Sequence, residues 1–270
     1  MKKLNIFLLG GTKDSTEIIM HLKNNYNTHI LTTTTTEYGS NLAIKAGSDE
    51  TIAKPLLKDE IIELINNSDF DILIDATHPF AEHITRTSVS VSKMCKIPYI
   101  RFERPSIDFN DIDTIHIIYA ESFENAGQII SKEIPKGNVL HFAGANTMED
   151  VLKNVSKDRF YPRILKVQKS IEKCKKLGIE NNHIIPMKGA ASLKENIDLI
   201  EKYNASVMIT KESGEIGGVI EKIQAANKKD ISLIMIKRPI IKELNKKNIV
   251  SNLNELDKKI KKIINAETEI

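Results

Sequence analysis

Hydrophobic residues recur along the chain in two alternating patterns, short continuous runs and longer stretches with helical spacing. The runs have the length of strands, and the stretches place apolar residues on one helix face, as at Ile18, Ile19 and Leu22. Strands that alternate with helices in this way predict βαβ units and parallel sheets. The predicted strands are residues 4–9, 28–34, 71–75, 98–102, 139–142, 161–165, 207–210 and 231–236. The predicted helices are residues 14–24, 56–67, 79–94, 147–154, 171–177, 192–203, 217–227 and 252–264.

The two halves of the chain repeat one plan. A strand runs into glycine at Gly11 in the first half and at Gly144 in the second. Gly11 to Asp75 spans 64 positions, Gly144 to Thr210 spans 66, and each half then closes a strand on an Arg-Pro pair. We therefore predict an α/β protein with two Rossmann-like lobes of parallel sheet and a ligand cleft between them. The predicted lobes are residues 1–110 and 111–270, with the boundary in the polar segment 106–113.

Composition and charge exclude several classes of protein. A chain of 270 residues that is 41% hydrophobic is long enough to bury a sizeable core. Its net charge of +3 is too weak to indicate a nucleic-acid partner. No stretch approaches the roughly 18 apolar residues of a membrane span, and the apolar run at residues 6–9 is too short for a signal peptide. These features favour a cytoplasmic protein without a membrane segment.

The first candidate site is the glycine turn between the first strand and the first helix. Backbone N–H groups in such a turn approach a phosphate closely, and the helix N-terminus adds partial positive charge. An ordinary strand-to-helix turn with a capping hydroxyl is the alternative. The next strand ends in threonines at residues 32–36, and the first acidic residue after them is Glu37, which favours NADPH over NADH. The residues predicted to hold a nicotinamide dinucleotide are Gly10, Gly11, Thr12, Ser15 and Thr33.

A second candidate follows a buried strand, where Asp75, Thr77 and His78 emerge together. Pro79 fits the first helical position, so His78 or Thr77 is expected at the helix N-terminus and all three residues at the carboxyl end of the strand. A capping role explains Thr77, but an adjacent aspartate and histidine are costly to bury without a function. His78 and His83 are five positions apart, which is not the one-turn spacing of a helical metal pair. We therefore predict no metal site.

Cations and glycines mark two further places. Only six of the 39 basic residues are arginines, and planar guanidinium groups suit carboxylates and phosphates. Arg101 and Arg104 lie at one strand end and Arg238 at another, although Arg101 could instead form a structural pair with Glu103. Residues 210–214 follow a buried strand, precede two more glycines, and form a second turn suited to anions.

Together these motifs resemble one family, the precorrin-6A reductases of cobalamin biosynthesis. The resemblance rests on LGGT at residues 9–12, DATHPFA at 75–81, PYIRFERP at 98–105 and TKESG at 210–214, followed by GG at 217–218, EK at 221–222 and RP at 238–239. It implies a two-lobed reductase that transfers hydride from NADPH or NADH to precorrin-6A or its cobalt complex, a tetrapyrrole with many carboxylates. The proton that accompanies the hydride is expected from Asp75, His78 or a water that they hold. The residues predicted to bind the substrate are Thr77, Arg101, Arg104, Lys211, Ser213, Gly214 and Arg238.

Two other functions stay open on the residues alone. A cofactor-free, two-lobed tetrapyrrole enzyme similar to uroporphyrinogen-III synthase would keep the basic cleft but would not need the glycine turn. A non-catalytic nucleotide-binding module would keep that turn but would not need Asp75, His78 or the second anion-binding turn. Nicotinamide binding and macrocycle binding separate these functions from the reductase. A monomer is favoured, and the metal state of the substrate is open.

Overall fold

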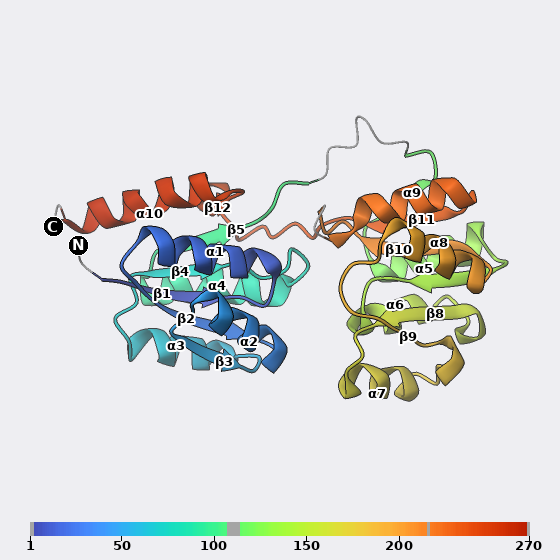
Figure 1. Cartoon of the computed structure of the whole chain (residues 1–270), viewed down its shortest axis with the longest axis horizontal. Helices are drawn as coiled ribbons and strands as arrows, with labels where there is room; N and C mark the ends of the chain where they lie inside the picture. Colours follow the sequence, from blue (N-terminus) through green and yellow to red (C-terminus); the bar gives the residue numbers. More distant parts are fainter. Residues whose placement is uncertain (1–2, 107–113, 215–216, 269–270) are drawn as a thin grey trace. The chain divides into compact units, whose positions relative to one another are not determined.

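The chain folds into two α/β units, seen in a computed structural model that describes residues 3–106, 114–214 and 217–268 (Figure 1). The first unit comprises Met1–Pro105 and Pro239–Ile270, and the second comprises Ser106–Arg238. Within the described residues, each unit holds a six-stranded sheet whose neighbouring strands are parallel. The prediction of two Rossmann-like lobes with parallel sheets is confirmed. The predicted cleft stays a prediction.

The first unit alternates strands and helices through its N-terminal part. Its strands are β1 (Leu4–Leu9), β2 (Thr28–Thr34), β3 (Glu50–Ala53), β4 (Ile72–Asp75), β5 (Tyr99–Phe102) and β12 (Ile249–Val250). Its helices are α1 (Lys13–Asn25), α2 (Glu37–Ala46), α3 (Lys58–Asn66), α4 (Glu82–Cys95) and α10 (Leu253–Thr268).

The second unit has the same alternation. Its strands are β6 (Ile117–Ala120), β7 (Asn138–His141), β8 (Phe160–Ile164), β9 (Ile185–Pro186), β10 (Ala205–Lys211) and β11 (Ser232–Ile236). Its helices are α5 (Phe123–Glu133), α6 (Met148–Leu152), α7 (Gln168–Lys176), α8 (Leu193–Lys202) and α9 (Val219–Lys229). The sequence analysis did not predict α2, β3, β6, α5 or the two-residue strands β9 and β12.

The internal repeat inferred from glycine spacing appears in the strand order. The first sheet runs β12-β5-β4-β1-β2-β3, and the second runs β6-β11-β10-β7-β8-β9. Position by position, β1 corresponds to β7, β4 to β10 and β5 to β11. The chain reverses its direction of travel across the sheet after β3 and again after β9, so the switch points lie between β1 and β4 and between β7 and β10. In such sheets, ligands bind at the carboxyl ends of the strands next to the switch point.

The C-terminal segment differs from the predicted division of the chain at residues 110 and 111. Residues 239–270 belong to the first unit, not to the second. The physical reason is an unfilled sheet edge: β12 pairs with β5, with Ile249 opposite Arg101 and Val250 opposite Phe102. Helix α10 then buries Leu256 and Ile260 in the core of the first unit. Residues 107–113, where the boundary was expected, lie outside the described residues.

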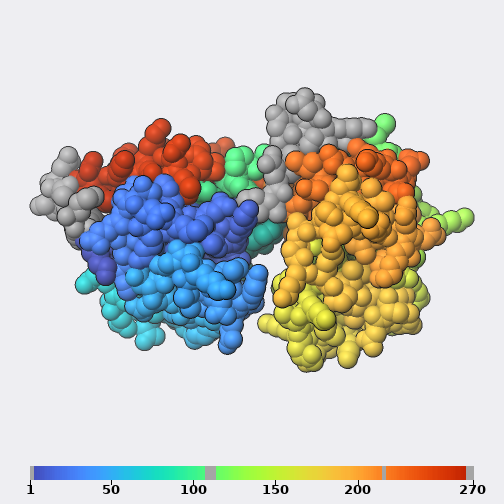
Figure 2. Space-filling view, in the orientation of Figure 1, coloured from blue at the N-terminus to red at the C-terminus, as the bar shows by residue number. Residues whose placement is uncertain are grey.

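Both faces of the first sheet are covered, so its central strands β1 and β4 are largely apolar on both sides. Helices α1, α2 and α10 pack on one face through Ile18, Leu22 and Ile260 among others. Helices α3 and α4 pack on the other face through residues such as Ile61 and Val89. Figure 2 shows α10, in red, lying directly on the N-terminal elements drawn in blue.

Candidate functional site

The glycine turn after β1 folds around the hydroxyl of Ser15. The backbone N–H groups of Gly11 and Thr12 both donate to Ser15 Oγ over 3.1 Å. Gly11 has a φ of +95°, in the left-handed region that favours glycine. A Cβ at Gly11 would meet only Thr34, at 3.9 Å, so one side of the turn is open. The N–H groups expected to bind a phosphate are therefore held by Ser15, beside space that a ligand could enter.

The carboxyl end of β2 lies against the same turn. Thr33 pairs with Leu9 across the sheet, and its carbonyl accepts a hydrogen bond from the Gly10 N–H over 2.8 Å. A Cβ at Gly10 would lie 2.9 Å from Thr32 Cγ2, so a side chain there would force the strands to shift. The five residues predicted to hold the cofactor thus lie together at the ends of β1 and β2.

Thr12 connects this turn to the end of β4. Its Oγ1 accepts a hydrogen bond from the Ser15 N–H over 3.0 Å and caps helix α1. The same hydroxyl donates to the carbonyl oxygen of Ala76 over 2.8 Å. Ala76 directly follows Asp75, so the predicted cofactor turn and the predicted catalytic turn share a hydrogen bond.

Asp75 is the centre of a buried hydrogen-bond network. Its Oδ1 accepts from the N–H of Thr77 over 3.0 Å, from the hydroxyl of Thr77 over 2.6 Å and from Arg101 Nη1 over 2.7 Å. Its Oδ2 accepts from Thr85 Oγ1 over 2.8 Å and from the Tyr99 hydroxyl over 3.0 Å. The network joins β4, α4 and β5 at the carboxyl edge of the sheet.

Burial sets the electrostatics of this network. The side chain of Asp75 is 0% exposed and that of Arg101 is 1% exposed. Burial disfavours the Arg101 charge, but Asp75, Glu103 and Tyr99 together outweigh it, so the pKa of Arg101 is raised. Burial, reinforced by Asp75, also raises the pKa of Tyr99. The geometry gives Asp75 the role of holding Thr77 and Arg101, because no part of its carboxylate reaches the surface.

His78 lies in a turn instead of at a helix start. Its Nδ1 accepts a hydrogen bond from the Phe80 N–H over 3.1 Å, and its carbonyl accepts from the Ala81 N–H over 2.7 Å. Helix α4 begins at Glu82, so the prediction that Pro79 opens the helix is wrong. The N–H groups of Phe80 and Ala81 donate their hydrogen bonds to His78 within this turn, and the helix starts only after them. Because Nδ1 accepts, the neutral ring carries its proton on Nε2.

Each arginine of the two Arg-Pro pairs binds a carboxylate of its own unit. Arg104 pairs with Asp14 in the first turn of α1, and both side chains are largely buried. Arg238 Nε lies 3.1 Å from Glu212 Oε2, and both side chains are 12% exposed. These arginines were predicted to bind substrate, and the structure places their guanidinium groups on protein carboxylates.

The second predicted anion-binding turn follows β10. Burial lowers the pKa of Lys211, the last residue of β10, to about 8. Ser213 is buried, and a Cβ at Gly217 would lie 1.8 Å from Ser213 Oγ, so only glycine fits there. Gly214 has a φ of +75°. Residues 215 and 216 of this motif lie outside the described residues.

The sequence analysis gave no role to three basic groups of the second unit: His141 and Lys222, which are buried, and Arg163, which is partly buried. His141 ends β7, is 0% exposed and has Nε2 3.1 Å from Thr147 Oγ1. Burial, with the nearby Lys211 charge, lowers the pKa of His141 to about 3.

Lys222 is 3% exposed and lies in the first turns of α9, between the buried residues Val219 and Ile223. A lysine at a position where the helical period calls for an apolar residue was the available signal.

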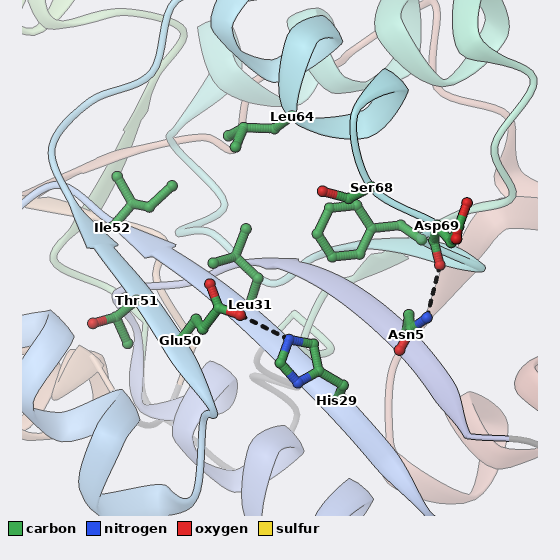
Figure 3. A pocket seen from close by; sticks show the side chains of 10 residues that line it. Asn5, His29, Leu31, Glu50, Thr51, Ile52, Leu64, Ser68 and Asp69 are labelled. Atoms are coloured by element: carbon green, nitrogen blue, oxygen red, sulfur yellow. Dashed lines mark hydrogen bonds and ion pairs between the residues drawn. The ribbon is translucent and has the colours of Figure 1, made fainter.

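A separate cavity of about 340 Å³ lies at the opposite, amino-terminal ends of the first three strands (Figure 3). Asn5, His29 and Glu50 mark these strand ends, and His29 Nε2 is 3.0 Å from Glu50 Oε1. Leu31 and Ile52 provide apolar lining. The residues predicted to bind ligands in this unit follow the carboxyl ends of the strands, away from this cavity.

The described residues contain no group of three or more histidine, cysteine, aspartate or glutamate side chains arranged to hold a metal ion. Among the same residues, no helix has both the length and the apolar character needed to cross a membrane. The two cysteines, Cys95 and Cys174, are free thiols.

Comparison with known proteins identifies the family. The model of the family "Precorrin-6x reductase CbiJ/CobK" matches residues 5–261. The chain is 38% identical to the cobalt-precorrin-6A reductase of Methanothermobacter thermautotrophicus, over 97% of this chain and 85% of the relative. It is also 38% identical to that of Methanocaldococcus jannaschii, over 88% of this chain and 92% of the relative. A solved structure of CobK precorrin-6A reductase, 14% identical, has the same fold with a TM-score of 0.75, covering 96% of this chain and 97% of that one. The chain therefore belongs to the precorrin-6x reductase family, CbiJ/CobK.

Proposed function

We propose that this chain reduces cobalt-precorrin-6A with NADPH, as an oxidoreductase of cobalamin biosynthesis. The cobalt complex is chosen over the metal-free substrate because the relatives at 38% identity are named cobalt-precorrin-6A reductases. The observation that carries the proposal is the hydrogen bond between Thr12 and Ala76, which joins the glycine turn to the Asp75–His78 turn. A cofactor site and a proton donor are thereby built on one edge of one sheet.

The glycine turn fits a dinucleotide. The open side of Gly11 allows a pyrophosphate to approach the backbone, and the start of α1 supplies partial positive charge. Gly10, Gly11, Thr12 and Ser15 would hold the phosphates, and Thr33 lies where the ribose is expected. A phosphate oxygen would replace Ser15 Oγ as the acceptor of the Gly11 N–H. Bound NADPH would supply the hydride.

The remaining chemistry is the delivery of one proton to the reduced macrocycle. His78 is the proposed donor in its imidazolium form, in which Nδ1 is protonated in place of accepting the Phe80 N–H and Nε2 gives its proton to the macrocycle; the residue is only partly buried. Asp75 is proposed as a positioning residue that fixes the turn through Thr77, since its carboxylate has no exposed surface. Thr77, Lys211, Ser213 and Gly214 stay the proposed substrate contacts.

The three predicted arginine contacts need a different account. Arg101, Arg104 and Arg238 hold Asp75, Asp14 and Glu212, respectively. We propose that they act on the substrate through the positions of these partners. A monomer in the cytoplasm stays the expectation for the working enzyme.

A titration tests the cofactor part of this proposal. Purified protein is titrated with NADPH and then with NADH, and the nicotinamide fluorescence is followed. We expect saturable micromolar binding of NADPH that is lost in Gly11→Val. Gly144→Val is the matched control, because Gly144 has a similar φ of +85° at the corresponding strand end of the second unit. Loss of binding in the control alone would place the cofactor in the second unit.

An anaerobic assay tests the reaction. Cobalt-precorrin-6A and NADPH are incubated with the enzyme, and the product is examined by mass spectrometry for the gain of two hydrogens. NADPH binding without turnover would support a nucleotide-binding module instead. Binding of polycarboxylate porphyrins without any NADPH binding would support a cofactor-free tetrapyrrole enzyme.

A further inference from the structure

Lys222 is a buried cation with very little to neutralise it. Its side chain lies on the core-facing side of α9, and the residue is 3% exposed. Its Nζ donates one hydrogen bond, to the carbonyl oxygen of Gly217 over 2.8 Å. An ammonium group has three donors, so this bond leaves most of its capacity unused. Burial, with the nearby positive charge of Arg163, lowers the pKa of Lys222 to about 7.

The position of Lys222 on its helix adds to the cost of its charge. Helix α9 begins after Gly218, whose φ of +66° is left-handed, and no described side chain caps its N-terminus. The free N–H groups at a helix start carry partial positive charge, which attracts anions and disfavours cations. Glu221, the acidic residue in the first turn of the same helix, offsets part of this cost, and an anion bound beside Lys222 would offset more of it.

Arg163 brings a second, partly buried cation close enough to lower the pKa of Lys222. It lies near the end of β8, with its guanidinium 5.4 Å from the centre of the Phe142 ring. One nitrogen donates to the Gly189 carbonyl, whereas Nε is buried and has no hydrogen-bond partner. Gly218 packs against the neighbouring Ala190, since a Cβ built on Gly218 would lie 2.9 Å from Ala190 Cβ. The segment of Gly189 and Ala190, which accepts the hydrogen bond from Arg163, therefore lies against the turn that precedes α9.

The nearby carboxylates do not neutralise these cations directly. Glu221 raises the pKa of Lys222 through space, but its Oε2 is buried without a hydrogen-bond partner. Glu195 acts on Arg163 in the same way, while its carboxylate accepts hydrogen bonds from the N–H and hydroxyl of Ser192, each over 2.8 Å. The described structure contains no ion pair between these glutamates and either cation.

We propose that Lys222, Arg163 and the N-terminus of α9 form an oxyanion-binding site in the second unit. Two sources could supply the oxyanion, a carboxylate of the tetrapyrrole or a phosphate of the nicotinamide dinucleotide. The carboxylate source rests on the proposed function, since only that function brings a polycarboxylate macrocycle to the protein. The site adds Arg163 and Lys222 to Lys211, Ser213 and Gly214, which precede the same helix.

Two titrations of the full-length protein test the site. One uses uroporphyrin III, an octacarboxylate, as the probe for the carboxylate source, and the other uses NADPH for the phosphate source. We expect Lys222→Met to weaken one of these probes at least tenfold while the Tm stays equal or rises. Lys228→Met is the matched control, because it removes the same charge from an exposed position of the same helix. The control is expected to bind both probes as the native protein does.

The change in Tm distinguishes a residue that binds an anion from a residue that only stabilises the fold. Unchanged affinity for both probes in Lys222→Met, whatever the Tm, would overturn the proposal. If Lys222→Met lowers both affinity and Tm, Arg163→Met decides: a tenfold loss for the same probe supports the site, and native affinity overturns it. Turnover of cobalt-precorrin-6A by the native enzyme is measured separately, so failure of the proposed function is distinguishable from failure of this site.

Discussion

Arg101 donates a hydrogen bond from Nη1 to Oδ1 of Asp75 over 2.7 Å, and the two side chains are 1% and 0% exposed. Removing one partner of such a pair leaves an uncompensated buried charge, which costs about 3–5 kcal/mol. We expect Arg101→Met to lower the free energy of unfolding by that amount, measured by urea denaturation followed by circular dichroism. Arg86→Met is the control, because the exposed ion pairs of Arg86 with Glu82 and Glu243 are worth at most about 1 kcal/mol. Equal losses in the two variants would contradict this interpretation of the buried pair.

The Thr12 hydroxyl is expected to couple cofactor binding to the catalytic turn. Thr12→Val removes both the cap of α1 and the hydrogen bond to Ala76, whereas Thr12→Ser keeps both. We expect Thr12→Val to weaken NADPH binding about 5- to 30-fold, a typical coupling of about 1–2 kcal/mol, and to lower kcat as well. Thr12→Ser should restore both values. A change in NADPH affinity without any change in kcat would show that the Ala76 bond is not used in catalysis.

The pair of Arg104 and Asp14 calls for a double-mutant cycle. If Arg104 mainly neutralises Asp14, the losses of stability in Asp14→Asn and Arg104→Gln will not add, and the coupling will be about 1–3 kcal/mol. The KM for the macrocycle should then change equally in the two single variants. A much larger KM effect in Arg104→Gln than in Asp14→Asn would restore Arg104 to the role of direct substrate ligand that the sequence predicted.

The repeat of strand, glycine and helix could be predicted from the sequence because it depends on local patterns. Continuous apolar runs mark strands covered on both faces, and Gly11 and Gly144 mark turns with positive φ. Edge strands carry less signal: β12 has two residues and β6 is only partly buried. The C-terminal segment was assigned to the second unit for this reason. Its return to β5 is a long-range pairing that no local pattern encodes.

The residue types at the candidate site could also be predicted from the sequence, but their hydrogen-bond and ion-pair partners could not. Asp75, Thr77 and His78 were identified from their position after a buried strand. The pairing of Arg104 with Asp14 joins positions 90 residues apart and required the structure. The sequence does not show which carboxylate an arginine pairs with. The three arginines were therefore predicted to bind carboxylates of the substrate. Lys222 was noted only as part of the resemblance and was given no role, because lysines on helices are usually solvated.

His141 makes the stability of the second unit sensitive to acid. Its pKa is lowered to about 3 in the folded protein, whereas an unfolded histidine titrates near 6.5. Above pH 6.5 both states are neutral and the group has no effect. Between pH 6.5 and 3 only the unfolded state takes up the proton, so stability falls by up to about 1.4 kcal/mol per pH unit. We expect the acid limb of the Tm profile to be less steep in His141→Gln, relative to its own Tm at pH 8.

The same profile has a matched control in the first unit. His29 is partly exposed and lies 3.0 Å from Glu50. His29→Gln removes a histidine without removing a buried neutral ring, so the slope below pH 6.5 should stay close to native. An equal flattening in both variants would show that the acid sensitivity is not specific to the buried His141.

Leu256 tests the assignment of the C-terminal segment to the first unit. Its side chain is 0% exposed and packs in the core formed by β1, β4, β5 and α1. Leu256→Ala should cost about 2–5 kcal/mol, the usual loss for a buried leucine. In hydrogen exchange, amides of β5 (Tyr99–Phe102) should lose protection, while amides of β10 (Ala205–Lys211) keep theirs. Ile200→Ala, a comparable truncation in the core of the second unit, should give the reverse pattern. Loss of protection in β10 on changing Leu256 would instead group α10 energetically with the second unit.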